Sequence, residues 1–358
     1  MIVMNLNLKN VFGFTAFDMN FAYPKKIANS IIENEHLAER PNFRYKKAVI
    51  LMGANATGKT ILGKVLMRIF KFISSGNTSL LLEMMSPNTV GSFVIDFVND
   101  GFILHRLSAI IDTENDTVTL KHSYTEIEEK DSYKKCTKRL CDEGTVISAE
   151  PKVLKKLFGE LKYYFPYPQI ESTSNTKEMK KDILLQTLRA VIGTLDPSLK
   201  DVTVATDLRE SFIIRRKGTE IIIQNGTLLN REILSGGTIQ GIDISIFLAA
   251  MFSGAAGFYY CDECFSHIQT DIEKRIFGIM LNTLKDNEQL IFTTNNTDML
   301  DINLPKHSYA FLRKTESEDG FPVSVVYASD ILERKTESVR CAVENQCFFL
   351  PARRFTAR

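Results

Sequence analysis

A glycine-rich loop between Gly53 and Thr60 carries the residue types that a phosphate-binding site requires. Its sequence, GANATGKT, fits the pattern G-x-x-x-x-G-K-[ST] and stands between the apolar run AVILMG and a segment with helical periodicity. Glycines let backbone N–H groups curl around phosphate oxygens, Lys59 offers an ammonium to the β- and γ-phosphates, and Thr60 offers a hydroxyl to Mg²⁺. We therefore expect nucleotide binding by Gly53, Asn55, Ala56, Thr57, Gly58, Lys59, Thr60 and Ile61.

A second pair of glycines occurs far down the chain, in the stretch LSGGT at residues 234–238. A serine followed by glycines, just ahead of an apolar run, is typical of a helix start whose backbone N–H groups can hold an anion. Ser235, Gly236 and Gly237 are therefore a second set of candidate nucleotide-binding residues. Either both loops bind one nucleotide, or each binds part of a different one.

Two carboxylates follow the apolar run GFYYC, at Asp262 and Glu263. At the C-terminal end of a strand, one carboxylate can hold Mg²⁺ and the next can polarise an attacking water. Taken alone, such a pair is more often a solvated strand end.

The uncharged stretch between Asp243 and Asp262 is broken by serines and glycines, so it predicts a buried helix to about Ser253, a glycine turn and a buried strand. A membrane span is the less favoured interpretation.

Together these motifs resemble a known superfamily. GANATGKT, LSGGT, FYYCDECFSHIQ and QLIFTTNN occur in the order and approximate spacing of the Walker A, signature, Walker B, D-loop and switch elements of ABC-type ATPases. The phrases LNLKNVFGF, TLDPSLKDVTV and QLIFTTNNTDMLD, the last followed by YAFLRK, are most similar to compact prokaryotic ATPases related to SMC proteins. Those include AbiL-type abortive-infection ATPases and the ATPase halves of OLD-type nucleases. The resemblance implies an α/β ABC-type P-loop ATPase head with a mixed central sheet, an antiparallel β subdomain and a helical insert.

The resemblance also implies roles for individual residues. In such heads two chains meet head to tail around two ATP molecules, because the signature of one subunit caps the γ-phosphate that the other subunit's Walker A loop holds. By position, Asp262 binds Mg²⁺ together with Thr60, Glu263 is the general base, and Ser266 is the D-loop serine. Gln169, in FPYPQIES, is the candidate Q-loop ligand that senses Mg²⁺ and γ-phosphate. An exposed loop glutamine is the alternative for that position.

Two positions depart from the superfamily pattern. The D-loop usually ends in aspartate or histidine, but here it ends in Gln269, and the switch histidine after FTT is replaced by Asn295. An asparagine can hydrogen-bond a phosphate oxygen or a water, but it cannot carry a proton or a positive charge. We therefore expect ATP binding with slow hydrolysis, and we place Asn295 in the catalytic set with Glu263 and Ser266.

Three functions remain open at this stage. The resemblance favours a sensor or switch of anti-phage defence that forms a homodimer or higher homo-oligomer and controls a separate effector, a toxin or a nuclease. The alternatives are a DNA-repair-type SMC-like ATPase and a non-hydrolysing ATP-dependent scaffold. Residues 302–358 are too few for the TOPRIM nuclease domain of OLD-type proteins, and residues 121–232 lack the long heptads of an SMC arm.

Composition sets broader limits. The chain has 358 residues, of which 44% are hydrophobic and 24% charged, as is typical of a globular protein, and its formal net charge of +1 gives no global attraction to nucleic acid. The basic runs YKKCTKR, RRK and PARRFTAR are either solvated faces or local contacts with nucleic acid or an acidic partner. Six cysteines form no dense framework, and MIVMNLNLKN is unlike a signal peptide, so we expect a cytoplasmic protein without a membrane anchor. Cys261 and Cys264 lack a second ligand pair, which favours core packing over zinc.

The elements that must position these motifs follow from apolar periodicity. Met4, Leu6 and Leu8 alternate with polar residues and predict an antiparallel strand, AVILMG predicts a strand buried on both faces, and a helix follows over residues 58 to about 74. Three runs after residue 90 predict a β-meander, and residues 126–143 are charge-rich and expected to be exposed.

The second half of the chain predicts helices within residues 151–200 and then a hairpin that turns at Lys217 and Gly218. Arg106, in the meander, either approaches the nucleotide or is a charge at a sheet edge. The expected segments are the N-terminal half of the head (1–125), a charged loop and helical insert (126–204), the C-terminal half of the head (205–325) and a tail (326–358).

Overall fold

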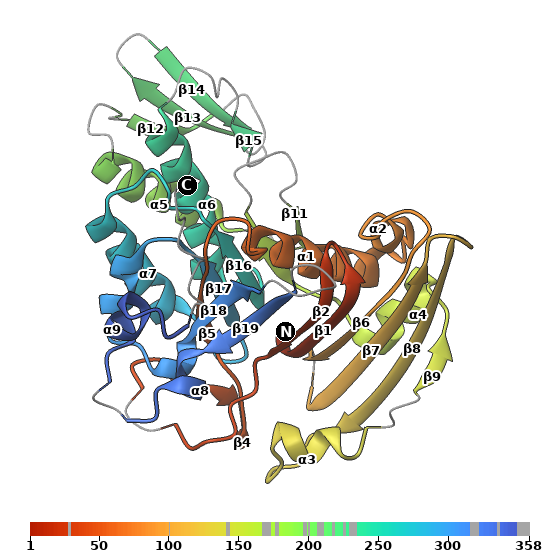
Figure 1. Ribbon diagram of the computed structural model, residues 1–358. Coiled ribbons are helices and arrows are strands. Elements are labelled where there is room, and N and C mark those ends of the chain that lie inside the picture. Colours follow the sequence, from red (N-terminus) through yellow and green to blue (C-terminus); the bar gives the residue numbers. More distant parts are fainter. Residues whose placement is uncertain are drawn as a thin grey trace, which may run out of the picture. The chain divides into compact units, whose positions relative to one another are not determined.

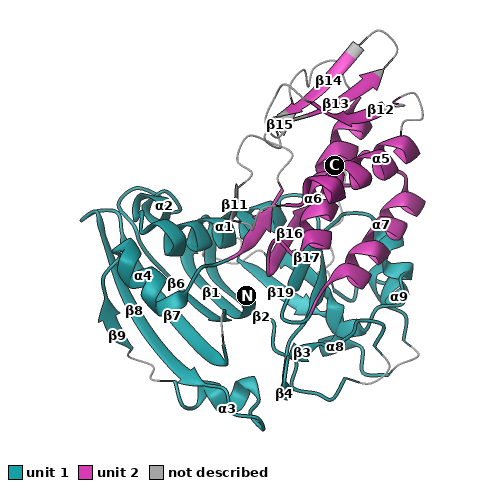
Figure 2. Ribbon diagram, turned by 180° about the vertical axis from the view of Figure 1, so that it is seen from behind, with its two compact units in different colours: residues 1–161, 286–358 teal, residues 162–285 magenta. Residues whose placement is uncertain are grey.

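The computed structural model contains two compact units, Met1–Leu161 with Asp286–Arg358, and Lys162–Lys285 (Figure 2). It describes residues 1–27, 30–99, 101–140, 144–166, 173–175, 179–195, 199, 201–205, 211–216, 219–224, 227–228, 235–315, 322–334 and 337–348. The unit boundaries fall near residues 161 and 285, whereas the segments expected from the sequence end at 125, 204 and 325. Those segments stay a prediction.

Unit 1 contains a six-stranded antiparallel sheet (Figure 1). Its order is β2 (Phe14–Asn20), β1 (Ile2–Val11), β6 (Val90–Val98), β7 (Ile103–Asp112), β8 (Thr117–Glu126) and β9 (Thr145–Ile147). The β6–β7–β8 meander and the alternating first strand are as predicted, and helix α4 (Pro151–Phe158) packs Phe158 against the rings of Phe97, His105 and His122.

The strand that precedes the glycine-rich loop is part of a second group of strands in unit 1. Strand β5 (Ala48–Met52) is buried throughout and pairs in parallel with β17 (Gln289–Thr293) and β18 (Tyr309–Lys314). Strand β19 (Val323–Tyr327) pairs antiparallel with β18, so this group is mixed. The remaining elements of unit 1 are α1 (Lys59–Ser75), α2 (Ser79–Leu82), α3 (Tyr133–Thr137), α8 (Ala328–Ile331), α9 (Val339–Glu344), the short strands β3 (His36–Leu37) and β4 (Arg40–Arg44), and the 3₁₀ helices Thr297–Asp301 and Lys306–Ser308.

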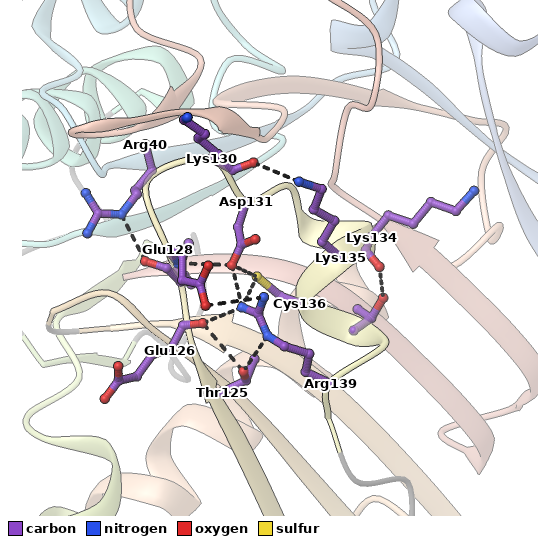
Figure 3. A network of polar contacts seen from close by, with 12 residues as sticks. Arg40, Thr125, Glu126, Glu128, Lys130, Asp131, Lys134, Lys135, Cys136 and Arg139 are labelled. Atoms are coloured by element: carbon purple, nitrogen blue, oxygen red, sulfur yellow. Dashed lines mark hydrogen bonds and ion pairs between the residues drawn. The ribbon is translucent and has the colours of Figure 1, made fainter.

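The charge-rich segment after β8 was expected to be exposed, but its described part is exposed only partly. Asp131 is buried, where it accepts hydrogen bonds from the guanidinium of Arg139 and from the backbone N–H of Glu128, the latter at 3.0 Å (Figure 3). The hydrogen bond from Arg139 holds the pKa of the Asp131 carboxyl below its usual range. Cys136 and Leu140 join the hydrophobic core, so an internal ion pair allows this charged segment to pack while its lysines stay exposed.

Unit 2 carries the second glycine pair and the predicted carboxylates. Strand β10 (Tyr163–Phe165) pairs antiparallel with β11 (Thr173–Asn175) and parallel with β16 (Phe258–Asp262). Helices α5 (Lys181–Leu195) and α6 (Gly236–Ser253) pack together, and their core is shared with a small antiparallel sheet. That sheet comprises β12 (Asp201–Val204), β13 (Ser211–Arg216), β14 (Thr219–Gln224) and β15 (Thr227–Leu228), and helix α7 (Thr270–Thr283) follows β16.

Two predictions about unit 2 are confirmed. Strands β13 and β14 form the expected hairpin, whose turn at residues 217–218 lies outside the described residues. Helix α6 ends at Ser253, Gly254 takes a left-handed φ of 59°, and β16 then leads to Asp262. Within the described part of the chain, α6 is the one helix that is long and apolar enough to cross a bilayer, but 67% of it is buried inside the fold, as in the core helix of a globular protein.

Candidate functional site

The glycine-rich loop has the local geometry of a phosphate cradle. It connects β5 to α1, as predicted, and Gly58 at the helix N-terminus has a φ of 102° that L-residues rarely adopt. At Gly53, a Cβ would lie 2.6 Å from Thr57 Oγ1 and 2.7 Å from the backbone oxygen of Leu312, so only glycine fits there. Thr57 Oγ1 donates to the Ala54 carbonyl at 2.8 Å and closes the turn. The loop therefore fits a phosphate group bound through backbone N–H donors.

The side chain of Lys59 folds back onto the first residues of this loop. Lys59 is only 4% exposed, and its ammonium Nζ donates to the carbonyl oxygen of Gly53 at 2.8 Å and to that of Ala54 at 3.4 Å. Phosphate oxygens are stronger acceptors for an ammonium than neutral carbonyls are. The ammonium of Lys59 can therefore exchange these carbonyl contacts for contacts with an anion. Thr60 follows Lys59 in the first turn of α1.

The asparagine at the predicted switch position, Asn295, is in direct contact with the same loop. Asn295 follows β17, and its Nδ2 donates to Oδ1 of Asn55 at 3.1 Å. The turn behind it is fixed locally, because Asn296 Oδ1 accepts from the backbone N–H of Asp298 at 3.0 Å. Asn55 and Asn295 were predicted as site residues from separate motifs, and the structure brings them together although 240 positions separate them.

Arg106 has a structural partner in the antiparallel sheet. Its guanidinium donates to both carboxylate oxygens of Asp96, each at 2.8 Å, and Tyr133 donates to Asp96 Oδ2 at 2.6 Å. Asp96 is fully buried, so its charge depends on this pairing. Since β7 lies between β6 and β8, Arg106 is not an edge residue, and this buried ion pair accounts for its position.

In unit 2, the second glycine pair begins a helix as predicted. Ser235 is the N-cap of α6, and its Oγ accepts from the backbone N–H of Thr238 at 3.2 Å. Gly236 and Gly237 occupy the first turn, where backbone N–H groups have no partner within the helix. Leu234 and the predicted metal ligand Gln169 lie outside the described residues.

The predicted carboxylates stand at the end of β16. Asp262 is the last residue of the strand and is buried, whereas Glu263 is half-buried with a left-handed φ of 45°. The neighbouring Cys261 and Cys264 are buried free thiols, and burial raises the pKa of Cys261. Within the described residues, no cluster of three or more histidine, cysteine or acidic side chains has the arrangement of a metal site.

Gln240, a buried amide on α6, was not among the residues predicted from the sequence. Its Nε2 donates to Ser266 Oγ at 2.8 Å, and its Oε1 accepts from the backbone N–H of His267 at 2.8 Å. Gln240 therefore ties the predicted D-loop to the helix that starts at the glycine pair. A single amide within a nearly uncharged helix, five residues after the capping serine, was the available signal.

Comparisons with known proteins support the fold. No protein-family model and no curated protein matches the sequence. Among solved structures, the chain is similar to an Smc head domain with a coiled coil and joint from Pyrococcus yayanosii, with 9% identity, a TM-score of 0.54, and coverage of 93% of this chain and 99% of that one. An SmcHead bound to the C-winged helix domain of ScpA has 12% identity and a TM-score of 0.52, over 93% of this chain and 100% of that one. An Smc head bound to the C-terminal domain of ScpA, derived from Pyrococcus furiosus, has 10% identity and a TM-score of 0.50, over 92% and 97%.

These similarities confirm the predicted fold class. The chain has the α/β architecture of an SMC head, an ABC-type ATPase fold, with mixed sheets and helices. Because identity is so low, the comparisons show the fold and leave the function to be argued from the residues.

Proposed function

We propose that this protein is an ABC-type ATPase that binds Mg-ATP, dimerises head to tail around two nucleotides and hydrolyses them slowly. The observation that carries the proposal is the strand–loop–helix geometry of residues 53–60. A Cβ at Gly53 would collide with Thr57, and the ammonium of Lys59 donates to the Gly53 carbonyl. The similarity of the fold to SMC head domains supports it.

The residues divide into those that hold the nucleotide and those that act in hydrolysis. Lys59 and the loop N–H groups bind phosphate, and Thr60 with Asp262 binds Mg²⁺, which neutralises phosphate charge when bound. Glu263 accepts a proton from the attacking water, and Asn295 orients the water or a phosphate oxygen through its amide. Gln169 remains a proposed Mg²⁺ ligand. Ser235, Gly236 and Gly237 serve the nucleotide of a second copy, with Ser266 beside them.

We further propose that the ATP-dependent dimer is the switch of an anti-phage defence system and that a separate toxin or nuclease is its effector, in the cytoplasm. The motif resemblance to AbiL-type and OLD-type ATPases motivates this role. Two of the similar SMC heads are described in complexes with a part of ScpA, which supports the idea that such a head acts through a partner protein. The buried position of α6 is consistent with a protein that does not insert into a membrane.

Loss of nucleotide binding in Lys59→Ala tests the site. The substitution removes the ammonium from the phosphate cradle, and charge-assisted hydrogen bonds are worth about 1.5–3 kcal/mol each, so we expect ATP affinity to fall on the order of 100-fold or more. Lys71→Ala is the matched control, because Lys71 is an exposed lysine on the same helix. Equal ATP affinity of Lys59→Ala and the parent in titration calorimetry would refute the site.

The alternative functions predict different behaviour of the parent chain. DNA-stimulated turnover that declines steeply with salt would favour a DNA-handling ATPase, for which the exposed lysines of α3, Lys134 and Lys135, are candidate contacts. ATP binding without any turnover would favour a scaffold. Identification of the protein that copurifies with the native chain would test the proposed effector directly.

A further inference from the structure

Gln240 is a buried side chain that connects two separate parts of unit 2. It lies on α6, is 6% exposed, and reaches the loop after β16 through both atoms of its amide. The backbone N–H of His267 can only donate, so the carbonyl oxygen of Gln240 must face it, and the NH₂ group then faces the hydroxyl of Ser266. The chemistry of the two partners thus fixes the orientation of the amide.

The two hydrogen bonds hold consecutive residues of the loop. Ser266 is bound through its side chain and His267 through its backbone, each at 2.8 Å. Loss of the amide would leave the N–H of His267 without this acceptor and the hydroxyl of Ser266 without this donor. Within the loop itself, the Ser266 N–H donates to the Glu263 carbonyl at 3.4 Å, and the Ile268 N–H donates to the Phe265 carbonyl at 3.0 Å. Gln240 therefore supplies short contacts between the loop and the helix.

This arrangement places an exposed histidine against the glycine pair. A Cβ on Gly236 would lie 3.3 Å from Cδ2 of His267, and a Cβ on Gly237 would lie 3.4 Å from its backbone oxygen. Ser235, Gly236, Ser266 and His267 are all exposed, whereas Gln240 beneath them is buried. The N-terminus of α6 and the loop thus present one continuous surface, and Gln240 is the residue that fixes one part of it against the other.

We infer that Gln240 is a positioning residue that pre-organises this surface for contact with a second copy of the chain. The inference rests on the proposed ATP-dependent dimer, in which Ser235 and Gly236 meet the partner's nucleotide. Gln240 contacts neither nucleotide nor partner in this account. It acts through Ser266 and His267, which it holds at a fixed distance from the glycine pair, so that dimerisation does not have to order the loop.

The variant Gln240→Met tests the inference, since methionine keeps the length of the side chain but forms neither hydrogen bond. Ser245→Ala is the matched control, because Ser245 is a buried polar residue of the same helix whose hydroxyl donates to the Gly241 carbonyl of that helix, at 2.6 Å. Hydrogen exchange of the His267 amide, ATP affinity under monomeric conditions and the Mg-ATP-dependent dimer constant are measured for parent and variants.

We expect the His267 amide of Gln240→Met to exchange at least about tenfold faster and its dimer constant to weaken at least about tenfold, the equivalent of one lost hydrogen bond. ATP affinity of the monomer should stay within about twofold, because residues 53–60 are unchanged. Ser245→Ala should match the parent in all three. A general loss of folding would instead change ATP affinity as well.

Unchanged His267 exchange in Gln240→Met, or unchanged dimerisation despite faster exchange, would overturn the inference. Failure of the proposed function looks different, because the parent itself would then not bind ATP or not dimerise with it. In that case the exchange measurement still decides whether Gln240 holds the loop, while its role in dimerisation is contradicted together with the dimer.

Discussion

Two residues of the candidate site hold left-handed backbone without being glycine. Ala56 has a φ of 63° and Glu263 a φ of 45°. For an L-residue with a Cβ, this conformation costs about 1–2 kcal/mol, and such strain persists where the surroundings impose it. Ala56 is in the loop that we assign to phosphate binding, and Glu263 is the proposed general base.

The first residue-scale prediction concerns Ala56→Gly. Glycine adopts a positive φ without steric cost, so we expect the free energy of unfolding to rise by about 1 kcal/mol, with ATP affinity equal or higher. Urea unfolding of the full chain measures the free energy of unfolding. The neighbouring Ala54→Gly is the control, because Ala54 does not have a positive φ and should lose stability. Destabilisation by Ala56→Gly would contradict the strain argument.

The second concerns Asn295, whose amide donates to Asn55 at 3.1 Å. An imidazole at this position adds a proton carrier that asparagine lacks, and acid–base assistance is typically worth about 100-fold or more. Asn295→His should therefore raise steady-state turnover without tightening ATP binding, and Asn295→Ala should lower the residual rate. A parent that already hydrolyses ATP briskly, with no gain in the histidine variant, would show that the substitution is neutral.

At the scale of the element, an unusual lysine, Lys46, lies two residues before strand β5. Lys46 is 5% exposed and donates to the carbonyls of Asn20 at 2.6 Å and Ala22 at 3.2 Å, with its Nζ 3.5 Å from the ring centre of Tyr327. Burial lowers the pKa of Lys46 from 10.5 to about 7, against an opposing effect of Asp330. Burial therefore disfavours the charged ammonium of Lys46 in the folded protein.

This shift predicts a pH dependence of stability. Because the folded-state pKa lies below the unfolded value, the unfolded chain binds more protons between about pH 7 and 10.5, so stability rises with pH in that window and is lowest below it. Relative to Lys46→Met, which cannot titrate, the parent should gain up to about 2 kcal/mol of unfolding free energy from pH 7 to 9. Parallel pH profiles of parent and variant in urea unfolding would contradict the shift.

A second element-scale prediction concerns the pair that joins β6 and β7. Arg106→Met leaves the fully buried carboxylate of Asp96 without its bidentate partner, and breaking such pairs costs about 3–5 kcal/mol. Thermal or urea unfolding should show this loss, while ATP affinity of the folded protein stays unchanged. Arg215→Met, which breaks a solvent-exposed pair with Glu220, should change stability little. Weaker ATP binding by Arg106→Met would instead assign Arg106 to the nucleotide.

The part of the fold and of the candidate site that could be predicted from the sequence differs between elements. Strand β5, helix α6 and strand β16 were predictable, because long apolar runs ending in glycine or a carboxylate leave few alternatives. The packing of α3 was not, since composition does not reveal that Arg139 neutralises a buried Asp131. The amide contacts of Gln240 and of Asn295 were also beyond reach, because residue spacing does not specify which side chains meet after folding.

At the scale of the whole molecule, the proposed sites are divided between two units of the chain. Residues 53–60 and Asn295 belong to unit 1, whereas the glycine pair, Asp262 and Glu263 belong to unit 2. A switch of the kind we propose uses ATP as a reversible link between two copies, because the γ-phosphate supplies charge-assisted bonds that hydrolysis removes. Slow hydrolysis would then set how long the dimer lasts.

The most direct test of this account is the mass of Glu263→Gln measured by light scattering with and without Mg-ATP. The substitution neutralises the proposed general base and spares Asp262, so ATP should stay bound and the dimer should persist. We expect the mass of one chain without nucleotide and of two chains with Mg-ATP, and Lys59→Ala in the same background should return the mass to one chain. A Glu263→Gln protein that binds ATP yet remains a single chain, or that hydrolyses ATP at the parental rate, would contradict the central claim.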